Sequence, residues 1–220
     1  TESFTEIFTR DRVLTYFGNS MIISIVTTAL TTLFGSMAAY AVVRGPLGKR
    51  ARSIFGIWFL VQKMYPAIAT AIPVYLVMRT LGLMNPVWAV ILPMVVSPFY
   101  IFLVRQYMVT IPQEMLEAGL MDGAGTVRTF LHIVLPISKP ILGAACALSF
   151  ADSWNMVEQP LIYLGNARDK LPLSAMFNDL STQEMGVAFA SAALYILPAL
   201  LMYTYFQEDI LLGIQLSDMK

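Results

Sequence analysis

Three polar side chains interrupt an otherwise apolar stretch in the second half of this sequence. Asp152, Asn155 and Gln159 lie within residues 141–164 and follow the i, i+3, i+7 spacing of one helix face. A carboxylate in such a stretch is costly to bury, so it normally faces other helices or a water-filled cavity. This pattern could hydrogen-bond a polar solute on its way across a membrane.

A second polar pair lies earlier in the chain. Gln62 and Lys63 fall within the apolar residues 54–78, where Gln62, Pro66 and Thr70 follow i, i+4 spacing. Lys63 could form a structural ion pair with Asp152, or both could line a pathway, and the pattern leaves these alternatives open. Aromatic rings beside such groups could stack on a sugar. The predicted pathway residues are Gln62, Lys63, Asp152, Trp154, Asn155 and Gln159, with Tyr163 as a second stacking ring.

Residue types that several other chemistries need are missing. The single His132 and the single Cys146 cannot build a zinc site, and no serine or cysteine stands in a nucleophile motif. Gly45, Gly48 and Lys49 lack the spacing of a phosphate-binding loop. The net charge is zero, so no basic field points to nucleic acid. We therefore expect no enzymatic activity, no metal, no cofactor and no nucleic-acid partner for this chain.

The composition indicates the elements that carry these residues. Of the 220 residues, 57% are hydrophobic and 13% are charged, and that charged share is about half of what a soluble domain uses. The outer surface is therefore expected to meet membrane lipid, with about 20 apolar residues per helix. The predicted fold is an all-α polytopic membrane protein with five transmembrane helices, at residues 19–43, 54–78, 87–104, 141–164 and 187–206.

The basic residues orient these spans. Seven of them lie in the first and third loops, against three in the alternate loops, and positive charge favours the cytoplasmic side. The sequence thus predicts an external segment 1–18, a membrane domain 19–206 with a long cytoplasmic loop 106–140, and a cytoplasmic tail 207–220. The N-terminus of this chain is expected outside and the C-terminus inside.

The long cytoplasmic loop is predicted to form two short helices. Thr110 is expected to cap the first, Gly123 to bend the chain, and Thr126 to cap a second helix over residues 127–134 that Pro136 stops. The first helix would show the small residues Ala118 and Gly119 beside charged ones. Because small residues let another backbone approach closely, we expect this element to dock into a cleft of another protein.

The same residues carry a family resemblance. Glu117-Ala118-Gly119, Gly123 and Ile133-Val134-Leu135-Pro136 have the spacing of the cytoplasmic loop signature of bacterial ABC importer permeases, with Gly119 in place of the usual alanine. The resemblance implies that the loop is a coupling helix that docks on an ATPase. The residues to which it gives this role are Glu117, Ala118, Gly119, Asp122, Gly123, Ala124, Ile133, Leu135 and Pro136.

Further short motifs resemble the carbohydrate-uptake branch of that family, similar to the maltose permease G subunit. They are Asn19-Ser20, Leu81-Gly82-Leu83, Ile111-Pro112 and Trp154-Asn155. The resemblance implies a core of six spans, the first missing from this chain, in a bacterial inner membrane. It also implies three partners: a second permease subunit, a dimeric cytoplasmic ATPase that binds ATP and Mg²⁺, and an extracytoplasmic solute-binding protein.

The predicted function is therefore the permease subunit of an ATP-driven importer of a sugar or oligosaccharide. Within the same class, the solute could instead be an amino acid, a peptide or a phosphonate. An ion-coupled secondary transporter is a further alternative, but it predicts charged residues in several spans and internal repeats. The sequence has one clear charged face and no evident repeat.

Overall fold

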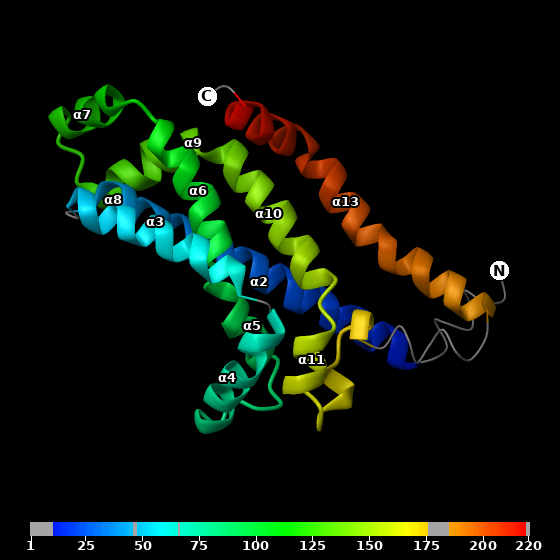
Figure 1. Cartoon of the computed structure of the whole chain (residues 1–220). Helices are drawn as coiled ribbons and strands as arrows, with labels where there is room; N and C mark the ends of the chain where they lie inside the picture. Colours follow the sequence, from blue (N-terminus) through cyan, green and yellow to red (C-terminus); the bar gives the residue numbers. More distant parts are fainter. Residues whose placement is uncertain (1–10, 46–47, 66, 176–184, 219–220) are drawn as a thin grey trace. The chain divides into compact units, whose positions relative to one another are not determined.

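The computed structural model describes residues 11–45, 48–65, 67–175 and 185–218, and this part of the chain is built from helices joined by short turns (Figure 1). The α-helices are α2 (Asp11–Arg44), α3 (Lys49–Met64), α4 (Ala67–Thr80), α5 (Trp88–Val95), α6 (Pro98–Thr110), α7 (Gln113–Met121), α8 (Thr126–Thr129), α9 (Leu135–Ile137), α10 (Lys139–Trp154), α11 (Glu158–Tyr163) and α13 (Met185–Asp218). A π-helical turn, η1 (Phe130–Val134), joins α8 to α9, and a short 3₁₀ helix, η2 (Arg168–Lys170), follows α11. The all-helical prediction is confirmed for the described residues.

The chain divides into two compact units, and each takes in several separate segments. The first unit comprises Thr1–Ala29, Pro66–Val95 and Leu148–Tyr205. The second comprises Leu30–Tyr65, Val96–Ala147 and Phe206–Lys220. The predicted coupling residues 117–136 belong to the second unit. The predicted pathway residues are divided, because Asp152 and Gln159 belong to the first unit and Gln62 to the second.

The core of the second unit lies between α2, α6 and the short helices after α6. Its buried side chains include Ala39 and Val43 from α2, Val104 and Met108 from α6, and Phe130 from η1. Side chains three or four positions apart lie on one face of a helix, and this spacing brings both long helices to the same core. The short helices are thus packed onto the ends of the long ones.

Within the first unit, hydrogen bonds join α2 to η2 and to the segment that follows it. The side-chain amide of Asn19 donates to the carbonyl oxygens of Asp169 (2.8 Å) and Leu171 (3.1 Å). The backbone N–H of Leu173 donates to the Ser20 hydroxyl oxygen at 2.8 Å. The Asn19-Ser20 motif therefore supplies hydrogen bonds that an irregular segment, lacking a helical partner for its backbone, requires.

Two helical stretches of the described chain are long and apolar enough to cross a membrane. They are Val13–Arg44 and Trp88–Thr110. The former contains the first predicted span, and the latter contains all but the first residue of the third. A third possibility is the pair Thr126–Ile137 and Lys139–Trp154, which meet at a bend of 77°. The predicted fifth span lies inside α13. The count of five spans remains a prediction.

Three predicted spans are not single helices, which corrects the simplest form of the prediction. Residues 87–104 are divided between α5, which ends at Val95, and α6, which begins at Pro98. Residues 54–78 are divided between α3 and α4, and Tyr65 is extended with φ −78° and ψ 129°. A residue before proline is pushed out of the helical region, and Pro66 follows Tyr65. Residues 141–164 are likewise divided, because α10 ends at Trp154 and α11 begins at Glu158.

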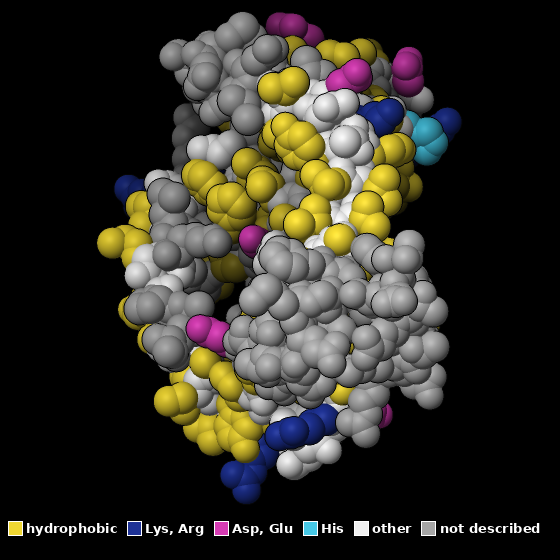
Figure 2. Space-filling model, turned by 90° about the vertical axis from the view of Figure 1, so that its right-hand side faces the viewer, with side chains coloured by type: hydrophobic (Ala, Val, Ile, Leu, Met, Phe, Trp, Pro, Cys, Tyr) yellow, Lys and Arg dark blue, Asp and Glu magenta, His cyan; other side chains and the backbone are white. Residues whose placement is uncertain are grey.

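Apolar side chains cover much of the described surface. Ile57 of α3 is 60% exposed, Ile72 of α4 is 70% exposed and Leu201 of α13 is 67% exposed. On the face shown in Figure 2, hydrophobic side chains predominate over charged ones among the described residues. Large apolar surface of this extent is expected where helices meet lipid.

Candidate coupling and solute sites

The first short helix of the predicted cytoplasmic loop, α7, has one buried and one exposed face. Leu116 is 6% exposed and Gly119 is buried, whereas Glu117 and Ala118 are exposed. The Glu117 carboxylate accepts a hydrogen bond of 3.0 Å from the Gln113 side chain. Figure 1 shows α7 beside α8, joined to α6 and α8 by short loops. The exposed face therefore presents the Glu117 carboxylate and the small Ala118 side chain to the surroundings.

Gly119 lies on the other side of α7 from its predicted position. A Cβ atom at this position would lie 2.5 Å from the Ile133 Cδ1 atom of η1. The sequence prediction placed Gly119 on the exposed docking surface beside Ala118, and its burial corrects that placement. The missing side chain lets α7 pack closely on η1, so Gly119 positions the exposed face and does not form part of it.

The bend after α7 is confirmed at the predicted glycine. Gly123 has φ +76°, a conformation that side chains strongly disfavour. The backbone N–H of Ala124 donates to the Gly119 carbonyl oxygen at 3.0 Å, and that of Asp122 donates to Ala118 at 3.1 Å. A glycine in the left-handed conformation, followed by a backbone hydrogen bond from Ala124 to the residue five positions earlier, is the Schellman ending of a helix. Gly123 therefore fixes where α7 stops.

The predicted helix caps are wrong in detail. Thr110 is the last residue of α6, and its hydroxyl donates to the Tyr107 carbonyl oxygen at 2.8 Å. Thr126 is the first residue of α8, whose N-cap is Gly125 without a side-chain hydrogen bond. Since α6 continues to Thr110, the Thr110 hydroxyl forms its hydrogen bond within α6 and cannot cap α7.

The second half of the loop is a wide helical turn that continues past its predicted end. Pro136 lies inside α9, and the backbone N–H of Leu135 donates to the Phe130 carbonyl oxygen, five residues earlier. We attribute the widening to Pro136, because a proline cannot donate to the preceding turn and its ring clashes with that turn's carbonyl. Leu135 and Ile133 are half-buried, so they pack on the core and α7, and Pro136 is exposed.

Three side chains from the long helices anchor these short ones. Arg44 donates to the Ile111 carbonyl oxygen at 3.1 Å, before α7 begins. The Tyr107 hydroxyl donates to the Ile137 carbonyl oxygen at 3.0 Å, and the Tyr40 hydroxyl to that of Thr126 at 3.3 Å. The ring of Tyr40 also packs on Phe130 at 5.0 Å. None of these anchors was predicted, because their partners are backbone carbonyls distant in the sequence.

The short helices also expose apolar side chains that the sequence analysis did not single out. Met121 is 87% exposed, Val127 is 71%, Leu131 is 49% and Met115 is 47%. We call these four side chains, together with Glu117 and Ala118, the loop surface. Exposed methionines beside small residues suit a surface that another protein covers.

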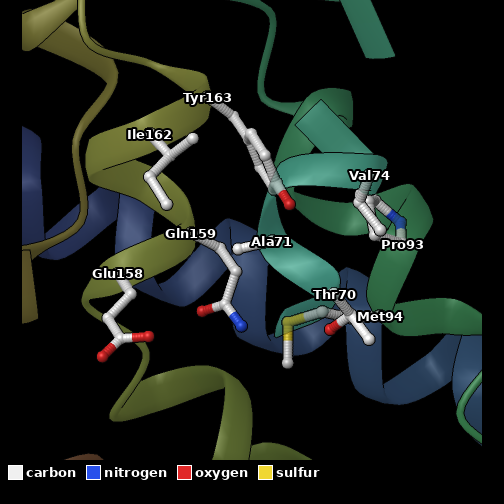
Figure 3. Close-up of a pocket in the computed structure, with 9 residues that line it drawn as sticks. All are labelled: Thr70, Ala71, Val74, Pro93, Met94, Glu158, Gln159, Ile162 and Tyr163. Atoms are coloured by element: carbon white, nitrogen blue, oxygen red, sulfur yellow. The ribbon is translucent and has the colours of Figure 1, made fainter. Parts of the chain in front are cut away.

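A pocket of about 140 Å³ lies in the first unit, between α4, α5 and α11 (Figure 3). Its lining residues are Thr70, Ala71 and Val74 of α4, Pro93 and Met94 of α5, and Glu158, Gln159, Ile162 and Tyr163 of α11. In Figure 3 the Tyr163 ring extends from α11 toward α4, and the Glu158 carboxylate lies at the edge. Gln159 and Thr70, both singled out from the sequence, thus face one space.

Trp154 does not have the predicted open position. Its side chain is 1% exposed, and its indole N–H donates to the Tyr195 carbonyl oxygen at 3.1 Å. The ring stacks on Phe150 at 5.6 Å and meets the edge of Phe17 at 5.9 Å. An indole enclosed in this way cannot stack on a sugar, so Trp154 is a packing residue of the first unit.

The remaining predicted pathway residues are distributed over both units. Asn155 follows α10, where its side chain donates to Ala151 at 2.8 Å and accepts from the Tyr195 hydroxyl at 2.8 Å. Asp152 is exposed in α10. Because α10 ends at Trp154, Asp152 and Asn155 do not share a helix face with Gln159, which corrects that spacing argument. Gln62 lies in the second unit, in α3, and the Lys63 side chain lies outside the described residues.

Residues 31–208 match the protein family described as "Binding-protein-dependent transport system inner membrane component". The chain belongs to this family. The family resemblance inferred from the loop signature is thereby confirmed, and the chain is a membrane component of a transport system that uses a binding protein. This identity agrees with the expectation that the chain is not itself an enzyme.

Several characterised permeases resemble this permease over most of their length. The arabinooligosaccharides transport system permease protein AraQ of Halalkalibacterium halodurans is 32% identical, covering 100% of this chain and 79% of that protein. The lactose transport system permease protein LacG of Rhizobium radiobacter is 30% identical, and the match covers 96% of this chain and 78% of LacG. The diacetylchitobiose uptake system permease protein NgcG of Streptomyces coelicolor is 30% identical, and the match covers 95% of this chain and 70% of NgcG.

A solved structure supports the fold of the permease. It is the crystal structure of a bacterial ABC transporter involved in the import of the acidic polysaccharide alginate, and the TM-score is 0.84. The match covers 94% of this chain and 78% of that one at 22% sequence identity. At this identity the likeness concerns the fold alone.

Proposed function

We propose that this chain is a permease subunit of an ATP-driven importer of a sugar or oligosaccharide. The observation that carries the proposal is the relationship over nearly the whole chain to permeases whose names specify oligosaccharides or disaccharides. The pocket supports it, since carboxylate, amide and hydroxyl groups are the usual partners of sugar hydroxyls. An amino acid, a peptide or a phosphonate remains the alternative solute.

The loop surface is proposed as the site where ATP hydrolysis is coupled to transport. Glu117 and Ala118 are exposed on α7, and Gly119, Gly123 and Ala124 set the position and end of that helix. A short helix so anchored can transmit a displacement, because its position relative to the long helices is fixed by the core. The partner would be a cytoplasmic ATPase dimer that holds ATP and Mg²⁺.

The assembly is proposed to contain a second permease subunit and an extracytoplasmic solute-binding protein. Two similar subunits would enclose the solute path, and ATP-driven closure of the ATPase pair would open its outer side. The bacterial inner membrane would hold the five spans, with residues 106–140 and the C-terminus in the cytoplasm.

Purification of the tagged permease from its native host tests the proposal. An ATPase subunit is expected to co-purify with the permease. Its ATP hydrolysis in nanodiscs should rise several-fold when the solute-binding protein is supplied with an oligosaccharide from a neutral panel. A parallel panel of amino acids and short peptides should have no effect. Stimulation by that second panel alone would assign a different solute to the permease, and absence of any ATPase would contradict the importer class.

A further inference from the structure

The pocket between α4, α5 and α11 is small for a site that encloses a whole ligand. Its volume is about 140 Å³, below the roughly 300–1,000 Å³ of sites that enclose drug-sized ligands. An oligosaccharide could therefore insert only part of its length, such as one sugar ring, and its other rings would stay outside the pocket.

The chemistry of the walls suits a ring with one apolar and one polar side. Ala71, Val74, Pro93 and Met94 provide apolar surface from α4 and α5. Gln159 offers both donors and an acceptor, and the hydroxyl of Tyr163 can donate or accept. Gln159 is half-buried and Tyr163 is 2% exposed, so hydrogen bonds made there would be partly shielded from water.

Hydrogen bonds tie together the segments that carry two of the helices around the pocket. The N–H of Asn85 donates to the Tyr163 carbonyl oxygen at 3.1 Å, which ties the segment before α5 to the end of α11. Lys170 donates to the Asn85 carbonyl oxygen at 3.4 Å, so a second segment is tied to the same place. A preformed site loses less conformational entropy on binding than one that must be ordered by its ligand.

Charge distinguishes the solutes that this pocket could accept. Glu158 lies at its edge in Figure 3, and its side chain is exposed. The nine described lining residues include this one carboxylate and no lysine, arginine or histidine. A carboxylate accepts hydrogen bonds from hydroxyl groups, and it repels a second carboxylate.

We propose that this pocket is an outer subsite for one uncharged sugar ring, and that Glu158 at its edge discriminates against acidic sugars. This inference rests on the proposed function and specifies the class of sugar. The segments joining α4 to α5 and following α11 are the predicted external loops, so the subsite would meet the solute early in its passage.

The test uses pairs of ligands that differ only in charge. Methyl glucoside and methyl glucuronide form one pair, and methyl galactoside and methyl galacturonide form the other. Saturation-transfer NMR on the purified complex in nanodiscs, without the solute-binding protein, gives half-saturation concentrations. In at least one pair, the uncharged glycoside should bind at least about ten-fold more tightly than its acidic partner. The reason is that Glu158 accepts hydrogen bonds from hydroxyl groups and repels the carboxylate of the acidic sugar.

Variants of the lining residues assign the binding to this pocket. Gln159→Ala should weaken binding of the uncharged ring about ten-fold, equal to about 1.4 kcal/mol. Glu158→Gln should remove most of the discrimination within a pair, because the amide keeps hydrogen-bonding capacity and loses the charge. Leu161→Ala is the matched control, since Leu161 belongs to α11, is 47% exposed and does not line the pocket.

Equal binding of both members in both pairs, no binding of any of the four ligands, or binding unchanged by Gln159→Ala would overturn the inference. Failure of this kind leaves the proposed function intact if an oligosaccharide still stimulates ATP hydrolysis through the binding protein. If only amino acids or peptides stimulate hydrolysis, the proposed function itself is wrong.

Discussion

At the scale of single residues, Gly123 and Gly125 form a natural pair for testing the bend after α7. Neither has an atom within 4 Å of an added Cβ, but only Gly123 has a positive φ, +76°. Gly123→Ala should therefore cost about 1–2 kcal/mol of backbone strain. Gly125, with φ −69°, should accept alanine without that cost.

The expected result is that Gly123→Ala reduces solute-stimulated ATP hydrolysis and the amount of ATPase that co-purifies, whereas Gly125→Ala leaves both unchanged. Both quantities are measured in the same nanodisc preparation. Equal behaviour of the two variants would show that the Schellman ending of α7 does not matter for coupling.

At the scale of elements, α7 provides an exposed and a buried position one turn or less apart. Ala118 is exposed, and Leu116 is 6% exposed within the core of the second unit. A photo-reactive maleimide attached to Ala118→Cys should therefore cross-link the permease to the ATPase. The same label at Leu116→Cys should react poorly and give little cross-linked product.

This experiment needs a cysteine-free background. Cys146→Ser is a conservative choice, because the Cys146 thiol lies 3.2 Å from the Thr32 hydroxyl and a serine can keep that contact. Cross-linked permease and ATPase are detected by electrophoresis and mass spectrometry. Cross-linking to lipid alone from Ala118 would place α7 in the membrane and contradict its proposed role.

At the scale of the whole molecule, the distribution of basic residues predicts which loops lie in the cytoplasm. Asn166, in the segment after α11, and Val127, at the start of α8, are both exposed. In the same cysteine-free background, a membrane-impermeant maleimide should label Asn166→Cys in spheroplasts with intact inner membranes. Val127→Cys should react only in inverted vesicles.

Accessibility of Val127→Cys in intact spheroplasts would reverse the proposed topology and remove the loop surface from contact with a cytoplasmic ATPase. Labelling of both positions on one side would contradict an odd number of spans between them. The assay depends on no knowledge of the solute, so it tests the architecture separately from the sugar assignment.

The sequence by itself determined the features that depend on local chemistry. Apolar stretches predicted that the chain is built from helices, and the spacing of Glu117, Gly123 and Pro136 predicted the short helices that the structure has in that loop. Gly123 was identified because a left-handed bend favours one residue type regardless of its neighbours. Breaks at Tyr65, after Val95 and after Trp154 were missed, although Pro66, Pro98 and Pro160 were visible signals for them.

Only the tertiary structure decided which side chains face one another. Trp154 is enclosed by Phe17, Phe150 and Tyr195, Gly119 packs on Ile133, and three separate helices form the pocket around Gln159. In a soluble protein, polarity separates inner from outer positions, so periodicity indicates the buried face. In a membrane protein, side chains facing lipid and side chains facing other helices are both apolar. Periodicity therefore could not tell an indole open to solute from one buried between helices, and only the positions of the neighbouring helices settle it.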